Sequence, residues 1–193
     1  MAFEDGSGLW VDETISQEYV LAADAERHAT HIDTYNLAVI EGLLQSDRYS
    51  RALSNGPGLD TPQEAIDTRV AHRAQRQSVL YGENPPQLRS VINEFALNQA
   101  VIIDGETQLG RLRGLSELPN VDIRVLRADS IPFLAAPNIA LSGTFRIIKS
   151  RAGEFVQTQS PLGAHISVDS EDIGIWKQNF EQLRAIAVPI GRM

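Results

Sequence analysis

The pattern that most constrains the fold is an apolar stripe near the C-terminus. Ile173, Trp176, Phe180, Leu183 and Ala187 recur at helical spacing, after a start rich in Asp, Ser and Glu. This spacing predicts an amphipathic helix, and a helix of this kind is stable when its apolar side is buried against a second layer of structure. Strand patterns elsewhere in the chain indicate that this layer is a sheet.

Strand and helix patterns are mixed along the rest of the chain. The β-branched and alternating segments predict strands at residues 31–40, 121–126, 143–150 and 154–160, the last two forming a hairpin, and a strand running into a turn at 87–97. Helices are predicted for residues 16–30, 45–53, 62–81 and 106–118. This order predicts a single α+β domain, with a small mixed sheet packed by helices.

Charge and composition limit the kinds of molecule that the chain is expected to bind. The chain has 193 residues, 42% of them hydrophobic, which is enough for one buried core. Its net charge of −8 argues against nucleic acid and anionic membranes, since both are bound through clustered Lys and Arg. The absence of cysteine removes thiolate chemistry, and the acidic start, MAFEDGSGLWVDE, is unlike a signal peptide. With no apolar run long enough to span a bilayer, we expect a cytoplasmic protein.

The sequence lacks the short motifs of several large enzyme classes. It contains no G-x-x-x-x-G-K-[ST], no G-x-G-x-x-G after a strand, no H-E-x-x-H and no G-x-S-x-G. Nucleotide enzymes, zincins and serine hydrolases are therefore disfavoured, and we expect no cofactor. An enzyme that works by positioning its substrate remains open.

The stretch DAERHATHID raises the question of a metal site. If it is helical, Asp24, His28 and His31 share one face, where a zinc ion could bind. Zinc usually needs three or four protein ligands, so a solvated or half-buried helix face is the preferred interpretation and no metal is expected. A lone His165, which we place near a strand end, is interpreted as structural or exposed.

The predicted helix over residues 62–81 carries arginines on one face. Arg69, Arg73 and Arg76 could bind an acidic ligand or partner through their guanidinium groups, or could form a solvated basic stripe. Glu94, which follows the apolar residues SVI, is the acid that we expect to be partly buried. A buried carboxylate needs a cation, and we expect an arginine of this helix to supply it.

Several blocks together resemble a known family. TYNLAVIEGLLQSDRYSRAL fits its first block, RVAHRAQRQSVL its second and INEFAL its third, and QLGRLRGLSELPNVDIRVL, LSGTFRII and DSEDIGIWKQNFEQLRAIAV follow in the same order. The chain thereby resembles the C-terminal domain of actinobacterial Scr1-type, antitoxin-like helix-turn-helix regulators, a domain of unknown function. The resemblance covers residues 19 to 188. It departs from the family pattern at Glu41, Asn93 and Gln159, where the family has Pro, Asp and Glu.

The resemblance implies a domain organisation. Residues 1–18 are expected to be a flexible lead-in, and residues 19–193 a ligand- or partner-binding domain like the C-terminal part of those regulators. The helix-turn-helix that precedes this domain in the family is not found in the sequence, so we expect a stand-alone domain without DNA binding. The paired histidines are not part of the family pattern.

These observations predict a domain that binds a small-molecule ligand or substrate, or a protein partner; a homodimer is left open. The alternative is a cofactor-free, cyclase-like enzyme of specialised-metabolite biosynthesis that catalyses by substrate positioning. A purely structural interaction protein is a third interpretation. A ligand pocket is expected between the 62–81 helix and the sheet. We expect its lining to comprise Tyr35, Gln45, Arg73, Gln77, Glu94 and Phe145.

Overall fold

The computed structural model describes residues 3–4, 10–11, 24–55, 61–133, 137–141, 143–160 and 163–192. The expected lead-in, residues 1–18, lies outside these ranges except for two short strands. These are β1 (Phe3–Glu4) and β2 (Trp10–Val11), which pair antiparallel with each other.

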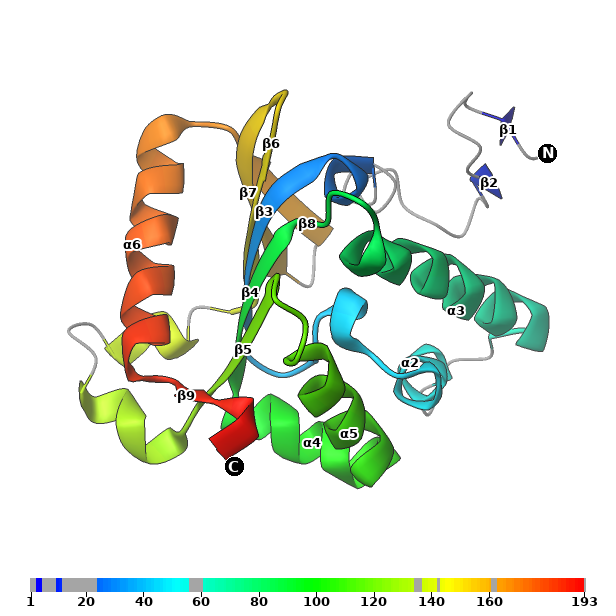
Figure 1. The fold of residues 1–193 in the computed structure, drawn as a ribbon, viewed down its shortest axis with the longest axis horizontal. Coiled ribbons are helices and arrows are strands. Elements are labelled where there is room, and N and C mark those ends of the chain that lie inside the picture. The colour runs from blue at the N-terminus through cyan, green and yellow to red at the C-terminus, as the bar shows by residue number, and fades with distance from the viewer. Residues whose placement is uncertain are drawn as a thin grey trace.

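A seven-stranded mixed sheet forms the centre of the fold, with the strand order β8-β7-β6-β3-β4-β5-β9 (Figure 1). Its strands are β3 (Ala29–Asn36), β4 (Gln87–Asn93), β5 (Val121–Leu126), β6 (Phe145–Ser150), β7 (Gly153–Ser160), β8 (Gly163–Ser167) and β9 (Val188–Pro189). The central strands β3, β4 and β5 run parallel, and every other neighbouring pair is antiparallel. The predicted α+β domain with a mixed sheet is confirmed.

Helices cover both faces of this sheet. Figure 1 shows α6 (Ser170–Ile186) on one face and the remaining helices on the other. Those helices are α2 (Asp47–Ser54), α3 (Gln63–Gln77), α4 (Glu94–Asp104) and α5 (Glu106–Leu115). Short 3-10 turns connect several elements, at η1 (Gly42–Leu44), η2 (Ser78–Tyr81), η3 (Ala128–Phe133), η4 (Pro137–Leu141) and η5 (Ile190–Arg192).

The alternation of side chains along each strand divides the core in two. On β3, Ile32 belongs to the apolar cluster beneath α2, α4 and α5, whereas Tyr35 belongs to the cluster beneath α6. Because each central strand is buried on both faces, β4 carries an almost uninterrupted run of buried residues.

The C-terminal helix forms as its apolar stripe predicts. The Asp169 side chain caps α6 by accepting hydrogen bonds from the backbone N–H groups of Glu171 (2.8 Å) and Asp172 (3.2 Å). Ile173, Phe180 and Leu183 are buried against the sheet. The helix therefore covers one face of the sheet, together with Ile131 of η3 and Ile139 and Ala140 of η4.

Three local predictions are wrong in part. In the described part of the predicted 16–30 helix, only residues 24–27 are helical, and β3 begins at Ala29. The predicted 62–81 helix leaves α-helical geometry at Gln77 and continues as η2. The expected turn after β4 is the helix α4, because the Asn93 side chain caps it by accepting from the backbone N–H of Phe95 (2.9 Å).

We find no helix in the described ranges that is both long and apolar enough to cross a bilayer.

Candidate functional site

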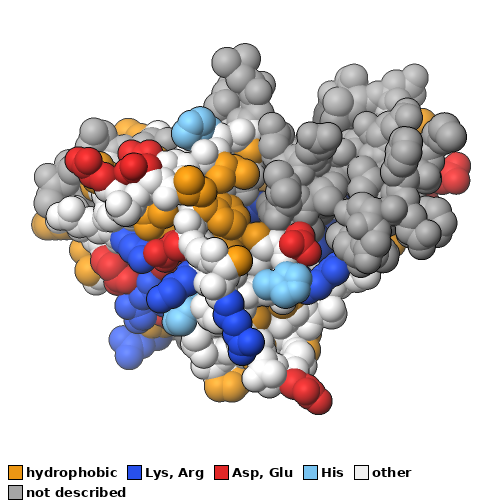
Figure 2. All heavy atoms as spheres, turned by 90° about the horizontal axis from the view of Figure 1, so that it is seen from above, with side chains coloured by type: hydrophobic (Ala, Val, Ile, Leu, Met, Phe, Trp, Pro, Cys, Tyr) orange, Lys and Arg blue, Asp and Glu red, His pale blue; other side chains and the backbone are white. Residues whose placement is uncertain are grey.

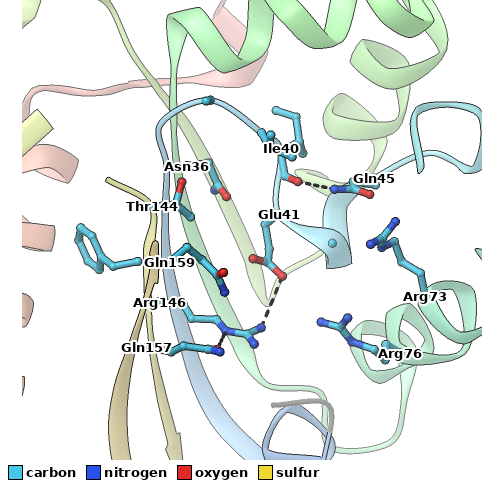
Figure 3. Close-up of a pocket in the computed structure, with 14 residues that line it drawn as sticks. Asn36, Ile40, Glu41, Gln45, Arg73, Arg76, Thr144, Arg146, Gln157 and Gln159 are labelled. Atoms are coloured by element: carbon cyan, nitrogen blue, oxygen red, sulfur yellow. Dashed lines mark hydrogen bonds and ion pairs between the residues drawn. The ribbon is translucent and has the colours of Figure 1, made fainter. Parts of the chain in front are cut away.

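A pocket of about 420 Å³ opens at the end of the sheet where β3 finishes (Figure 3). Three parts of the chain enclose it: the segment from Asn36 to Gln45, helix α3 through Arg73 and Arg76, and strands β6 and β7. On the strands, Arg146, Gln157 and Gln159 point towards the segment after β3 (Figure 3). The pocket therefore lies between α3 and the sheet, as the sequence predicts.

The floor of the pocket is the η1 turn, which buried amide side chains hold in place. Leu43 and Leu44 anchor the turn in the core and are fully buried. The Gln77 amide donates to the backbone carbonyls of Gly42 (2.8 Å) and Gln45 (2.9 Å). Gln108 donates to the carbonyl of Leu44 (2.9 Å). Because these bonds satisfy backbone carbonyls that are buried or partly buried, they hold the turn in this conformation.

Helix α3 lies close to this floor at Gly42. A Cβ at this position would lie 3.5 Å from Nε of Arg73 and 3.7 Å from Nη2 of Arg76, which is ordinary van der Waals contact. Both guanidinium groups therefore lie next to the turn. Arg73 also donates to the Ser50 hydroxyl, which ties α3 to α2.

A buried ion cluster, formed by Glu26, Arg76 and Arg146, stands behind the pocket. Arg76 binds the Glu26 carboxylate in a bidentate manner, through Nε (2.9 Å) and Nη2 (2.7 Å), and Arg146 donates to the same carboxylate (2.5 Å). Burial by itself raises the pKa of the Glu26 carboxyl, but the two guanidinium groups outweigh it and hold the pKa below its usual value. The cluster joins the 24–27 segment, α3 and β6.

Glu41 brings a second carboxylate to the pocket. Its closest cation is Arg146, with an N–O separation of 3.8 Å, while Arg146 also donates to Gln157 (2.5 Å). Arg146 is therefore shared between Glu26, Glu41 and Gln157, and its short contacts are those to Glu26 and Gln157. Figure 3 shows its contacts with Gln157 and Glu41. The Glu41 carboxylate is left with acceptor capacity on the pocket side.

Three of the six predicted lining residues border the pocket, namely Gln45, Arg73 and Phe145. Arg73 lies on the predicted helix, which is α3, whereas Gln45 follows η1 and precedes α2 instead of starting a helix. Phe145 borders it at the start of β6, but its ring is buried beneath α6, with its centroid 5.8 Å from that of Tyr35 and 4.6 Å from that of Trp176. Its contribution to the pocket is thus not the aromatic ring.

The other three predicted residues lie away from the cavity. Tyr35 is fully buried on the α6 face, where its hydroxyl donates to the carbonyl of Ala140 (2.6 Å) and accepts from Asn93 (3.0 Å). Gln77 lies beneath the η1 turn as described above. Glu94 accepts a hydrogen bond from the backbone N–H of Ala128 (2.8 Å) at the start of η3.

The expected pairing of Glu94 with an arginine of α3 is not found among the described contacts. The more deeply buried acids are Glu26, Asp33 and Asp104, whose residues are 1%, 6% and 4% exposed. An arginine of α3 does neutralise a buried acid, but the acid is Glu26 and the arginine is Arg76. Glu94 instead starts α4, where a carboxylate is favoured by the helix dipole.

The geometry assumed for the DAERHATHID stretch is wrong. His28 follows the last helical residue, and His31 lies on β3, so Asp24, His28 and His31 do not share a helix face. Asp24 and His28 are both more than half exposed, with 3.8 Å between the carboxylate and the imidazole. In the space-filling view, the visible histidines lie at separate places (Figure 2). The described ranges contain no group of three or more His, Asp or Glu side chains placed to hold a metal ion.

His165 lies within β8, opposite Thr158 of β7, and is exposed.

Sequence reasoning missed several residues of the pocket. Asn36, Arg146 and Gln157 lie on strands, where alternation alone does not distinguish a pocket side chain from an exposed one. Glu41 and Gln159 were noticed only as departures from the family pattern, and both line the cavity. Positions that depart from a family pattern near one strand end were therefore the available signal.

The fold is an α+β domain, and the cavity described above lies at the end of its central strand β3. A family model described as a domain of unknown function (DUF5753) matches residues 19–191, and the chain belongs to this family. Neither a curated protein nor a solved structure matches the chain.

Proposed function

We propose that this chain is a small-molecule-binding domain related to the ligand- or partner-binding part of Scr1-type regulators. The observation that carries the proposal is the pocket between α3, the η1 turn and the sheet. Its volume of about 420 Å³ lies within the range typical of ligand sites. A cavity of this kind suits a small molecule better than it suits the flat surface of a protein partner.

The pocket is built to persist without a ligand. The backbone carbonyls of the η1 turn are held by Gln77 and Gln108, and α3 is joined to β6 through Glu26. A preformed site loses less conformational entropy on binding than one that must be ordered. This rigidity supports ligand binding as the role of the pocket.

The charge around the pocket is opposite in sign to that of the whole chain. Arg73, Arg76 and Arg146 surround or back it, against the two carboxylates of Glu26 and Glu41. In a chain with a net charge of −8, this local excess of positive charge favours a ligand without a positive charge of its own.

The proposal is tested by native mass spectrometry after incubation with a small-molecule extract of the cells that produce the protein. Gln159→Trp, at an exposed position of β7 that points into the pocket, should obstruct the cavity. Lys149→Trp, at an exposed position of β6 outside the pocket lining, is the matched control. We expect a bound small molecule on the native chain and on Lys149→Trp, and its loss from Gln159→Trp.

Other outcomes separate the alternatives. Equal binding by both tryptophan variants would place the ligand elsewhere and refute the pocket. Capture of a protein without any small molecule would favour the partner-binding alternative. Release of the bound species with an altered mass would favour the enzyme that positions its substrate.

A further inference from the structure

We propose that the ligand of this pocket is a molecule built on secondary amide groups, of the chemistry of a short blocked peptide, whose N–H groups donate to Gln45 and Asn36. This inference rests on the proposed ligand-binding function. It adds the chemical class of the ligand and the atoms that recognise it.

Gln45 presents an acceptor with no partner. The residue is only 3% exposed, and its amide nitrogen donates to the backbone carbonyl of Ile40 (2.6 Å). A carbonyl oxygen can only accept, so this bond fixes which end of the side-chain amide is the nitrogen. The opposite atom, Oε1, is buried and has no hydrogen-bond partner within the described ranges. Because Gln45 lines the pocket, a donor on a ligand could satisfy this oxygen.

Asn36 presents a second acceptor at the end of β3. The side chain is fully buried, and its nitrogen donates to the hydroxyls of Thr34 (3.2 Å) and Ser90 (3.1 Å). Its Oδ1 is buried without a partner in the same described ranges, and the residue lines the pocket. Two buried, unsatisfied acceptors beside one cavity are unusual in a native protein, and both require donors of the same kind.

The α3 side of the pocket carries donors only. Arg73 and Arg76 reach the pocket from α3, and Arg73 lies beside Gln45 (Figure 3). A guanidinium has no acceptor and attracts carbonyl oxygens and anions. The pocket thus offers acceptors along the 36–45 segment and positive charge along α3.

A secondary amide matches this arrangement because it carries an N–H donor and a carbonyl acceptor at opposite ends. Ala38, Val39 and Ile40 add apolar lining, which suits the apolar side chain of an amino acid better than the hydroxyls of a sugar. A simple cationic amine would supply donors and could meet the Glu41 carboxylate, but the guanidinium groups of Arg73, Arg76 and Arg146 outnumber that carboxylate in the lining and disfavour a cation.

The test is an NMR titration of the complete chain with four small probes. N-acetyl-leucine N-methylamide and N-acetyl-leucine methyl ester differ in one N–H group, whereas methyl α-glucoside and n-butylamine represent a hydroxyl-rich and a cationic ligand. We expect the amide to bind about five to ten times more tightly than the ester, as for the loss of one hydrogen bond to a buried acceptor. We also expect the side-chain NH₂ signals of Gln45 and Asn36 to shift.

A substitution at Gln45 tests whether its side-chain oxygen causes the difference in affinity between the amide and the ester. Gln45→Met retains the length of the side chain and lacks the oxygen, so it should abolish the difference between amide and ester. Gln75→Met, at an exposed position of α3, is the matched control and should retain it. If Gln45→Met does not fold, the comparison of the two probes on the native chain and the shifts of the two NH₂ groups decide the question alone.

The two proposals fail in different ways. Equal binding of amide and ester, or tighter binding of the glucoside or the amine, overturns the amide class. Binding of an extract molecule that Gln159→Trp abolishes, together with no binding of any of the four probes, also overturns the class but leaves ligand binding standing. Absence of both kinds of binding refutes both.

Discussion

Replacing Glu26 by Gln should destabilise the domain strongly at neutral pH. Glu26, Arg76 and Arg146 have side chains that are 2%, 9% and 12% exposed, so the cluster is almost completely removed from water. The substitution retains the shape of the side chain and removes its charge. It therefore leaves two buried guanidinium groups without their main counter-charge.

The size of the effect follows from this burial. Breaking a buried ion pair by removing one partner costs about 3–5 kcal/mol. Glu41 lies 3.8 Å from Arg146 and remains as a partial counter-charge, which favours the lower end, about 3 kcal/mol. In a domain of this size each kcal/mol lowers Tm by about 2–4 °C, so we expect a decrease of about 6–12 °C.

The effect should also depend on pH. The pKa of Glu26 is lower in the folded protein than its ordinary value of about 4.3, so ionised Glu26 contributes stability that is fully present above this pH. That contribution is lost as the pH falls through the lower, folded-state pKa, because the folded carboxylate is then protonated as well. The difference in stability between the native chain and Glu26→Gln should therefore shrink below about pH 4.3.

Urea unfolding followed by far-UV circular dichroism, at a series of pH values, measures this difference. Asp67→Asn is the control, since Asp67 pairs with Arg51 on the surface with both side chains about half exposed, and it should change stability little. The reasoning would be refuted if Glu26→Gln lowered the free energy of unfolding at pH 7 by less than about 1 kcal/mol, the range of a surface pair. A difference that stayed constant into acid would contradict the assigned role of the charge.

Three further substitutions test the framework around the pocket, each by urea unfolding. Tyr35→Phe should lower the free energy of unfolding by about 1–3 kcal/mol, since the buried carbonyl of Ala140 loses its donor. It should leave ligand binding unchanged, and weaker binding would show that Tyr35 does contribute to the ligand site. Ser46→Ala should lower the free energy of unfolding by about 1–2 kcal/mol, because the Ser46 hydroxyl caps α2 by accepting from the N–H of Tyr49. An unchanged free energy of unfolding would show that this cap does not stabilise the domain. Gly105→Ala should cost about 1–3 kcal/mol, because φ +58° and ψ −139° are strained for a residue with a Cβ; an unchanged midpoint would contradict this.

Local periodicity was enough to predict a helix or strand where that element has one clear buried side. The stripe of α6 and the alternation of β5 each identify the element and its packed face, and both predictions hold. Helix α4 lacks such a pattern, since it is apolar on several sides and leaves Phe95 and Ile102 exposed. Only Asn93 and Glu94 separate its apolar residues from those of β4, and the capping bond of Asn93 marks the boundary. A single side-chain hydrogen bond is not visible as a period in the sequence.

The ion cluster illustrates why the site was only partly predictable. The sequence indicates that an arginine of the 62–81 helix neutralises a buried acid, and Arg76 does so. The acid expected from the sequence, Glu94, was the wrong one, because Glu26 is 50 residues from Arg76 and 120 from Arg146 along the chain. Only the order of strands in the sheet, with β3 beside β6, brings these segments together. Burial of a charge is thus set by topology, which periodicity does not determine.

Gln45 and Gln77 show that the residue types near a site do not by themselves determine what each residue does. Both are polar and fit the family pattern, so sequence reasoning assigned them the same role, and the structure buries both. Gln77 uses its nitrogen for two backbone carbonyls and its oxygen for Arg111 (2.6 Å), so both ends of its amide have protein partners. Gln45 uses its nitrogen for Ile40, but no described group satisfies its oxygen. The first is therefore a support of the pocket floor and the second a candidate contact for a ligand. The distinction depends on counting partners atom by atom, because burial favours a polar side chain only when each of its atoms is paired.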